Sequence, residues 1–109
     1  MNRFDEAIEY YNKVLQIEPN NIIAHGQLGL ALAATGKIDE AIEQFRIVLK
    51  ASPDDVEMHC NTGLLLEQQG KIDLAVSEYH QAIQIDPNYT KAADLLNAAS
   101  EKQKNSKEK

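Results

Sequence analysis

Apolar residues recur along most of the chain at intervals of three or four positions, with polar residues between them. This spacing places the apolar side chains on one face of an α-helix. In residues 38–51, for example, Ile38, Ala41, Phe45 and Val48 fall on one such face. The pattern predicts helices at residues 3–17, 22–35, 38–51, 56–69, 72–85 and 89–103.

The pattern repeats when the sequence is shifted against itself by 34 residues. A fixed period of this length indicates stacked structural units, because each unit buries its apolar face only against its neighbours. Residues of the same kind recur in all copies, including Asp5, Asp39 and Asp73; Ala7, Ala41 and Ala75; Tyr11, Phe45 and Tyr79; Pro19, Pro53 and Pro87. Others recur between the second and third copies, including His25 and His59, Gly29 and Gly63, Leu32 and Leu66, Gly36 and Gly70.

Glycine and proline predict where the helices end. Gly36 follows a predicted helix, and a glycine there closes the helix by adopting the left-handed conformation. Asn2 stands at the same place in the first copy, and we expect it to take over this left-handed role. Pro53 prevents the preceding helix from continuing. The residues after the three prolines are expected to form turns or to cap the next helix: Asn20, Asp54 and Asn88.

The glycines inside helices predict a close approach between helices. Gly29 and Gly63 each cost about 1 kcal/mol relative to alanine in a helix interior. The expected gain is space for a neighbouring helix, with Phe45 and Tyr79 filling the gap beside it.

Together these positions resemble the tetratricopeptide repeat (TPR) family, whose 34-residue motif is W-x₂-L-G-x₂-Y…A-x₃-F…P. The resemblance covers residues 1–88, with histidine in place of tryptophan and leucine in place of the motif tyrosine. The motif positions are His25, Leu28, Gly29, Leu32, Ala41, Phe45 and Pro53 in the second copy, and His59, Thr62, Gly63, Leu66, Ala75, Tyr79 and Pro87 in the third.

The resemblance implies an all-α TPR solenoid of stacked antiparallel helix pairs, within one domain at residues 1–99. The first copy starts on the second helix of its pair, so it counts as a partial repeat. The predicted parts are a partial repeat at 1–21, full repeats at 22–55 and 56–88, a capping helix at 89–103 and a polar tail at 104–109.

The net charge and the cysteine content indicate which ligands and which covalent links are expected. The 109 residues carry a net charge of −6, and four lysines lie among the last ten residues, so the rest of the chain is more acidic still. An acidic surface repels phosphate backbones, which disfavours nucleic-acid binding. Cys60 is the single cysteine, so no internal disulfide forms. No apolar run reaches the about 20 residues of a membrane span, and we predict a cytoplasmic protein without membrane partners.

No constellation of residues indicates catalysis. His25 and His59 stand where the family has tryptophan, and we interpret them as packed side chains rather than metal ligands. The glycines of residues 29–36 lie in a helical pattern without the strand and Gly-Lys-Ser/Thr ending of a phosphate loop. We therefore expect no enzyme activity, no metal and no cofactor.

With catalysis and nucleic-acid binding disfavoured, the expected function is recognition of another protein. In TPR stacks the first helix of each pair lines a concave groove, and the resemblance assigns groove positions to this chain. Gln27 and Asn61 are one repeat apart and are expected to stack as amides that pair with the backbone of an extended peptide. The predicted peptide-binding groove consists of Ile23, Gln27, Leu30, Glu57, Asn61, Leu64, Gln68, Lys91 and Leu95, with acidic Glu67 and Asp94 beside them.

Some TPR domains clamp the C-terminal carboxylate of chaperones with lysine, arginine and asparagine side chains. Asn61 and Lys91 match that set, whereas Ile23, Gln27 and Leu95 stand at positions of the other members. Glu57 adds a nearby negative charge, so the resemblance disfavours a chaperone-tail clamp.

Two functions follow from the sequence. The first is a protein-interaction scaffold that holds a peptide or helix of a partner in the groove, with the outer face around Glu43, Gln44 and Glu78 as the alternative surface. The second is a structural segment of a longer array, or a module that self-associates through its incomplete first repeat. The second is suggested by an apolar strip on the first helix, formed by Phe4, Ile8, Tyr11 and Leu15.

Overall fold

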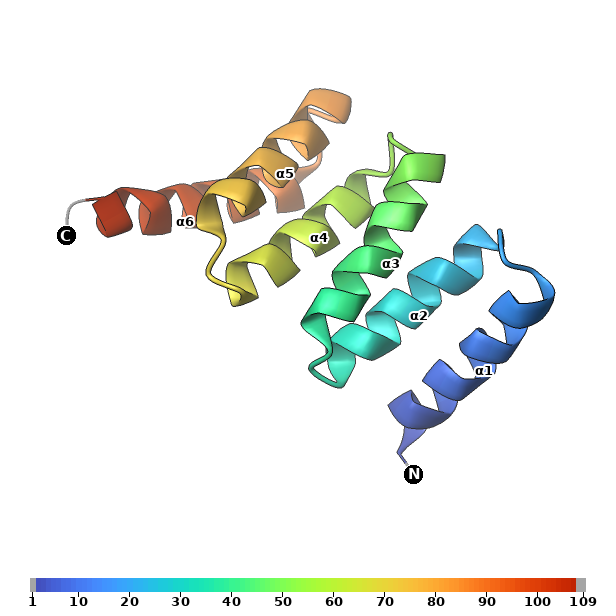
Figure 1. Ribbon diagram of the computed structural model, residues 1–109. Helices are drawn as coiled ribbons and strands as arrows, with labels where there is room; N and C mark the ends of the chain where they lie inside the picture. Colours follow the sequence, from blue (N-terminus) through green and yellow to red (C-terminus); the bar gives the residue numbers. More distant parts are fainter. Residues whose placement is uncertain (1, 108–109) are drawn as a thin grey trace. The chain divides into compact units, whose positions relative to one another are not determined.

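The computed structural model describes residues 2–107, and this part of the chain is all α-helical (Figure 1). The first five helices begin and end within one residue of the predicted bounds. The helices are α1 (Arg3–Ile17), α2 (Ile22–Ala34), α3 (Ile38–Ala51), α4 (Val56–Gln68), α5 (Ile72–Ile85) and α6 (Thr90–Lys107).

The end of α6 differs from the prediction. The helix was expected to stop at residue 103, but it continues through Lys107. Residues 104–107 contain neither proline nor glycine, and lysines are favourable at the negative end of a helix. Two side-chain contacts also hold α6 in place: Lys102 Nζ lies 3.0 Å from Glu67 Oε1, and Gln103 Nε2 donates to Asp73 Oδ1 at 2.7 Å. Residues 108 and 109 of the predicted tail lie outside the described residues.

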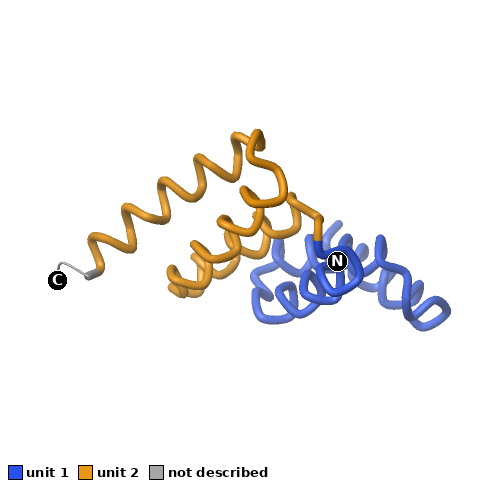
Figure 2. Tube along the Cα trace, turned by 90° about the horizontal axis from the view of Figure 1, so that it is seen from above, with its two compact units in different colours: residues 1–53 blue, residues 54–109 orange. Residues whose placement is uncertain are grey.

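The chain divides into two compact units, residues 1–53 and residues 54–109 (Figure 2). In unit 1, α2 packs against both α1 and α3. In unit 2, α5 packs against both α4 and α6. Each unit therefore has its own core.

The turns after α2 and α4 follow the prediction. Gly36 has φ 82° and Gly70 has φ 79°, the left-handed conformation that glycine adopts without strain. The prediction for Asn2 is wrong. Its φ is −84°, and its side chain instead caps α1 by accepting a hydrogen bond from the backbone N–H of Asp5 at 2.8 Å.

Of the two roles predicted for Asn20, Asp54 and Asn88, the structure shows the turn, and the residue after Asn20 or Asp54 caps the next helix. Asn21 accepts from the N–H of Ala24 at 2.9 Å, and Asp55 accepts from the N–H of Met58 at 3.0 Å. Asn20 and Asp54 lie in the preceding turns. The sequence thus located each turn but not which of two adjacent polar residues provides the cap.

The predicted helix crossing is confirmed in both units. A Cβ atom added to Gly29 would lie 2.5 Å from Cε1 of Phe45, and one added to Gly63 would clash with the ring of Tyr79. Phe45 is 1% exposed and Tyr79 is 0% exposed. The two aromatic rings are therefore the largest side chains of the cores, and each lies directly over a glycine.

The histidines join the same helix pairs through hydrogen bonds. His25 Nδ1 lies 2.6 Å from Gln44 Oε1, and His59 Nδ1 lies 2.8 Å from Glu78 Oε2. Glu78 is buried and Gln44 is partly buried, so the prediction that they belong to an exposed outer face is wrong. Burial requires a partner for such polar groups, and the histidines supply it.

A second polar contact exists in unit 2 but has no counterpart in unit 1. The hydroxyl of Tyr79 donates to Glu67 Oε2, and Lys102 binds the other oxygen of the same carboxylate. Burial raises the pKa of Tyr79 well above its ordinary value, and the hydrogen bond to Glu67 raises it further. At the equivalent positions of α2 and α3, unit 1 has Ala33 and Phe45, so this helix pair lacks both the carboxylate and the hydroxyl.

The glycine crossing is testable by adding one methyl group. Gly63→Ala is expected to lower the free energy of unfolding by about 1–3 kcal/mol, because the new Cβ overlaps the ring of Tyr79. On propensity alone, alanine would instead stabilise the helix by about 1 kcal/mol. Urea unfolding followed by circular dichroism measures the difference, with Ser77→Ala on the exposed side of α5 as the control. A gain in stability would refute the close contact.

The contact between Tyr79 and Glu67 is testable by copying unit 1 into unit 2. Tyr79→Phe is expected to destabilise the protein by about 1–3 kcal/mol, because the buried oxygen of Glu67 loses its donor. The double variant Tyr79→Phe with Glu67→Ala reproduces the Phe45–Ala33 pair and is expected to recover part of that loss. Urea unfolding of the two variants decides between these outcomes. A double variant that is less stable than Tyr79→Phe would contradict the analysis.

The raised pKa of Tyr79 predicts a loss of stability at alkaline pH. The unfolded chain loses the phenol proton at the ordinary value of about 10, before the folded chain does, so the contribution is complete below that pH and declines above it. We expect the free energy of unfolding to fall progressively as the pH rises above about 10, and to fall less in Tyr79→Phe. Urea unfolding across this range tests the prediction. An identical decline in both proteins would assign the effect to other groups.

Candidate protein-interaction surface

One face of α2 is exposed and carries the residues predicted for the groove. Ile23, Gln27 and Leu30 are spaced by four and three residues, which places them on one side of the helix. Ile23 is 77% exposed and Leu30 is 45% exposed, although both are large apolar side chains. The opposite face, with Leu28 and Leu32, is buried against the other helices of unit 1. We call the exposed set the α2 stripe.

The equivalent face of α4 forms a second stripe in unit 2. Glu57, Asn61, Leu64 and Gln68 follow one another at helical spacing. Glu57 and Gln68 are exposed, while Asn61 and Leu64 are partly buried. This α4 stripe therefore combines an apolar side chain, two amides and a carboxylate on one accessible surface.

The first turns of α6 lie beside α4 and extend the α4 stripe. Leu95 packs against a small core of Cys60, Ala82 and Ala92, which joins α4, α5 and α6. Lys91, four residues earlier, is exposed. The structure thus brings together six of the nine predicted groove residues in unit 2 and the other three in unit 1.

The pKa of Cys60 depends on its burial and on two charged side chains near the α4 stripe. Burial raises the pKa of its thiol; the positive charge of Lys91 lowers it, and the negative charge of Glu57 raises it. Both charged side chains therefore act on the same buried atom. Since the thiol is 0% exposed and stays protonated, Cys60 is a core residue rather than a nucleophile.

Glu67 does not contribute the free negative charge that was expected of it. Its carboxylate binds Tyr79 and Lys102, and its side chain is 11% exposed. The exposed charged residues of α4 and the facing part of α6 include Glu57, Asp94, Lys91 and Lys102. This surface is less acidic than the sequence suggested.

Gln27 belongs to unit 1 and Asn61 to unit 2. Their expected stacking as an amide pair stays a prediction. Within unit 2, Asn61 and Lys91 both lie on the surface formed by α4 and α6, as a carboxylate-binding pair requires. The remaining positions of the chaperone clamp are still Ile23, Gln27 and Leu95, which carry no charge. Of the five clamp positions, Lys91 is therefore the one that carries a positive charge.

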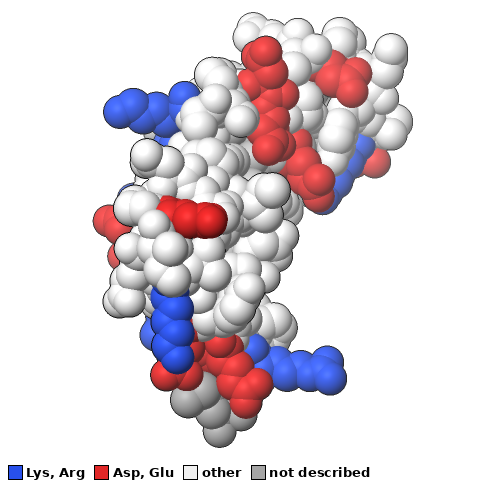
Figure 3. Space-filling model, turned by 90° about the vertical axis from the view of Figure 1, so that its right-hand side faces the viewer, with Lys and Arg blue, Asp and Glu red and all other residues white. Residues whose placement is uncertain are grey.

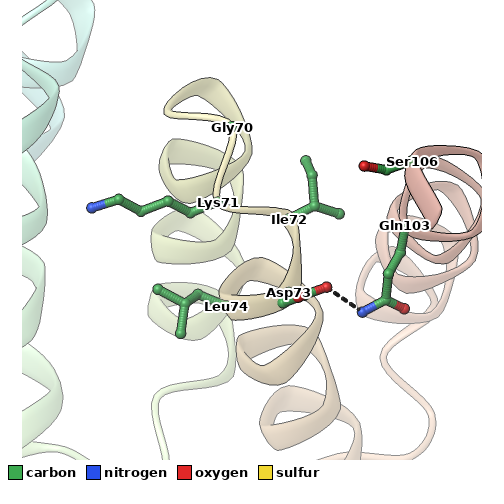
Figure 4. Close-up of a pocket in the computed structure, with 7 residues that line it drawn as sticks. All are labelled: Gly70, Lys71, Ile72, Asp73, Leu74, Gln103 and Ser106. Carbon is green, nitrogen blue, oxygen red and sulfur yellow. Dashed lines mark hydrogen bonds between the residues drawn. The ribbon is translucent and has the colours of Figure 1, made fainter. Parts of the chain in front are cut away.

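A cavity of about 350 Å³ lies at the other end of unit 2 (Figure 4). It is formed by the turn before α5 and the end of α6, and the hydrogen bond between Asp73 and Gln103 crosses beside it. This cavity was not predicted from the sequence, because the two segments that form it are 30 positions apart at Asp73 and Gln103. Its lining residues are Gly70, Lys71, Ile72, Asp73, Leu74, Gln103 and Ser106.

The described residues contain no cluster of three or more His, Cys, Asp or Glu side chains able to hold a metal ion. His25 and His59 instead use Nδ1 to bind Gln44 and Glu78. Within residues 2–107, no helix combines the length and apolar character needed to cross a membrane.

Comparison with solved structures identifies the fold. The chain is similar to the first TPR of Spaghetti (RPAP3) bound to the HSP90 peptide SRMEEVD, with a TM-score of 0.85, 20% identity, and coverage of 93% of this chain and 80% of that one. It is also similar to the Sgt2 TPR domain from Aspergillus fumigatus, with a TM-score of 0.86, 20% identity, and coverage of 97% and 72%. A MamA double mutant has a TM-score of 0.87 at 21% identity, with coverage of 93% of this chain and 57% of the longer MamA chain.

Sequence comparison gives the family directly. No curated protein matches the chain by sequence. The profile of one TPR family, described as tetratricopeptide repeat, matches residues 27–90, and a second, described as TPR repeat, matches residues 1–36. The first match spans more than half of the chain and includes the Gly29–Phe45 and Gly63–Tyr79 crossings. The chain belongs to the tetratricopeptide repeat family.

Proposed function

We propose that this protein is an interaction module that binds a peptide or helix of a partner protein on the exposed stripes of α2 and α4. The observation that carries the proposal is the surface of unit 2. There Asn61 and Leu64 of α4, and Lys91 and Leu95 of α6, are accessible on two helices that meet at the core of Cys60 and Ala92. Core packing accounts for the buried side of α4 but not for this combination on its accessible side. The TPR neighbour that was solved with an HSP90 peptide supports a peptide as the kind of ligand.

The proposed contacts follow from the chemistry of the stripe. The carboxamide of Asn61 offers a donor and an acceptor, so it can pair with both polar groups of a peptide unit. Leu64 and Leu95 offer apolar surface for a side chain of the ligand. An extended peptide presents both kinds of group in alternation, which favours it over a charged small molecule.

Charge selects among peptides. Glu57 and Asp94 are exposed near Lys91, so two negative charges face one positive charge. We expect neutral or weakly basic peptides to bind better than acidic ones, with affinity that falls as salt is added. The acidic peptide SRMEEVD, bound by the TPR neighbour, is therefore expected to be a poor ligand here.

A second function is a structural one, in which the chain is part of a longer TPR array or associates with itself. The incompletely buried apolar face of α1 favours it. Light scattering over a range of concentrations separates the two, because self-association raises the measured mass with concentration and peptide binding does not.

The peptide-binding proposal predicts the effect of removing one amide. A peptide selected from a displayed random library against the full chain is expected to lose about 1–3 kcal/mol of binding free energy with Asn61→Ala, because its backbone groups are left without a partner. Isothermal titration calorimetry measures the change. Gln27→Ala tests the α2 stripe in the same way.

A matched amide provides the control. Gln81→Ala removes an exposed amide from α5 and is expected to bind the peptide as the parent does. If Asn61→Ala, Lys91→Ala and Gln27→Ala all retain parental affinity for the selected peptides, binding lies elsewhere and the proposed surface is wrong. Unchanged circular dichroism spectra of the variants exclude unfolding as the cause of a loss.

A further inference from the structure

The cavity of unit 2 is formed where α6 is longer than α2 and α4. The helices α2 and α4 each have 13 residues, whereas α6 has 18. The glycine that follows α2 or α4, Gly36 or Gly70, is replaced at the same repeat position by Lys104. The helix α6 therefore continues past this position and places Ser106 beside the turn between α4 and α5 (Figure 4).

The side chains around the cavity differ in the direction in which they point. In Figure 4 the hydroxyl of Ser106 points toward Ile72, and the hydrogen bond from Gln103 to Asp73 lies below them. Lys71 also lines the cavity, but its side chain points away from α6 in this view. The charged group that faces α6 is therefore the carboxylate of Asp73, and Ile72 provides an apolar wall.

Acceptor groups at this cavity are available to a ligand. A carboxylate has about four acceptor positions, and Gln103 Nε2 uses one position of Asp73 at 2.7 Å. Ser106 is exposed, and a hydroxyl both donates and accepts. Ile72 is partly buried and Leu74 is 52% exposed, so apolar surface lies beside these polar groups. The cavity therefore suits a ligand that has an apolar stem and several donors at its end.

Among protein side chains, arginine meets this description. Its methylene stem packs against apolar surface while the charged head stays in contact with water. The planar guanidinium carries five N–H donors in a fixed fork, so it reaches acceptors on α5 and α6 at once. A lysine ammonium is a compact, strongly hydrated charge without this fork. The cavity volume of about 350 Å³ accommodates the arginine side chain.

Charge alone does not identify the site, because exposed carboxylates are common on this acidic chain. Figure 3 shows several of them on one face of the molecule, where uncharged surface separates the charged groups. An ion pair with such an exposed group contributes little, since water screens the charge. Asp73 differs because Ile72 lies beside it and α6 faces it, so a bound side chain gains contacts in addition to the ion pair.

The lysines of α6 do not fill the cavity. Lys102 Nζ is bound to Glu67 Oε1 at 3.0 Å. Lys104 is exposed and lies about 100° around the helix from Gln103, which faces the cavity. The carboxylate of Asp73 thus remains accessible to a cation from another protein.

We propose that this cavity binds an arginine side chain of a partner protein. The guanidinium donates to the carboxylate of Asp73 and to the hydroxyl of Ser106, and the methylene stem packs against Ile72. Gln103 is a positioning residue, since its amide holds Asp73 against α6. The site goes beyond the proposed peptide surface, because Lys91 and Gln103 are 12 positions apart, about 18 Å along the helix.

The test adds a capped tripeptide, acetyl-Gly-Arg-Gly-amide, to the full 109-residue chain and follows the backbone amides by nuclear magnetic resonance. Saturable shifts are expected at residues 70–74 and 103–106. The dissociation constant is expected in the millimolar range, because a single side chain provides the contact. The same tripeptide with citrulline has the shape of arginine without its charge, and we expect it to bind at least about fivefold more weakly.

One substitution in the chain removes the charge without removing the hydrogen bond to α6. Asp73→Asn keeps an oxygen that accepts from Gln103, and its affinity for the arginine peptide is expected to fall to that of the parent for the citrulline peptide. Asp39→Asn is the matched control, because the sequence Gly-Lys-Ile-Asp occurs at residues 36–39 as well as at residues 70–73. This control is expected to bind as the parent does.

Equal affinity for the arginine and citrulline peptides, or parental affinity of Asp73→Asn, would overturn the proposal. Equal or tighter binding of acetyl-Gly-Glu-Gly-amide at the same residues would assign the cavity to an anion near Lys71 and overturn it as well. Asn61→Ala is expected to leave the shifts at the cavity unchanged. If this variant abolishes them, the arginine is bound by the α4 stripe, so the cavity proposal is wrong while the proposed function stands.

Discussion

The structure depends on one steric constraint, the contact between a glycine of one helix and an aromatic ring of the next. Without a Cβ at Gly29 or Gly63, the rings of Phe45 and Tyr79 reach the backbone of the partner helix. This close approach places the alanines Ala41 and Ala75 in the core, where both are 0% exposed. Helix packing of this kind tolerates little change in volume, because protein interiors are close-packed.

Within this constraint the two units have diverged in the polarity of their buried contacts. In unit 1, His25 contacts Gln44, and the buried aromatic residue is Phe45, which has no hydroxyl. In unit 2, His59 contacts the carboxylate of Glu78. Tyr79 in unit 2 also binds Glu67, which in turn binds Lys102 of α6. The charged contacts of unit 2 link the terminal helix to the core, and α6 otherwise has a weak apolar face. The same repeat geometry therefore supports a mostly neutral core and a more polar one.

The buried contacts also determine which side chains remain for recognition. Gln44, Glu67 and Glu78 are polar, yet each has a partner inside its own unit. The side chains left on the accessible faces of α2, α4 and α6 are a mixture of amides, leucines and a few charges. On α1 the exposed side chains are mostly charged or polar, with Phe4, Tyr10 and Ile17 exposed among them.

The sequence by itself determined the helices, their turns, the repeat and the glycine crossing. These features rest on local rules, namely helical spacing, the left-handed conformation of glycine and the volume of a missing Cβ. The sequence also identified the residues of the α2 and α4 stripes, whose exposure the structure describes and whose role in binding stays a proposal. It did not determine which polar residues are buried, because Gln44, Glu67 and Glu78 look like surface residues until their partners are known. The tertiary structure alone decided that the histidines bind Gln44 and Glu78, that α6 extends to Lys107, and that Asn2 caps α1 instead of closing a turn. The histidine contacts and the contacts of α6 join residues far apart in the sequence, and the pattern of apolar and polar residues within one helix does not show which distant residues meet.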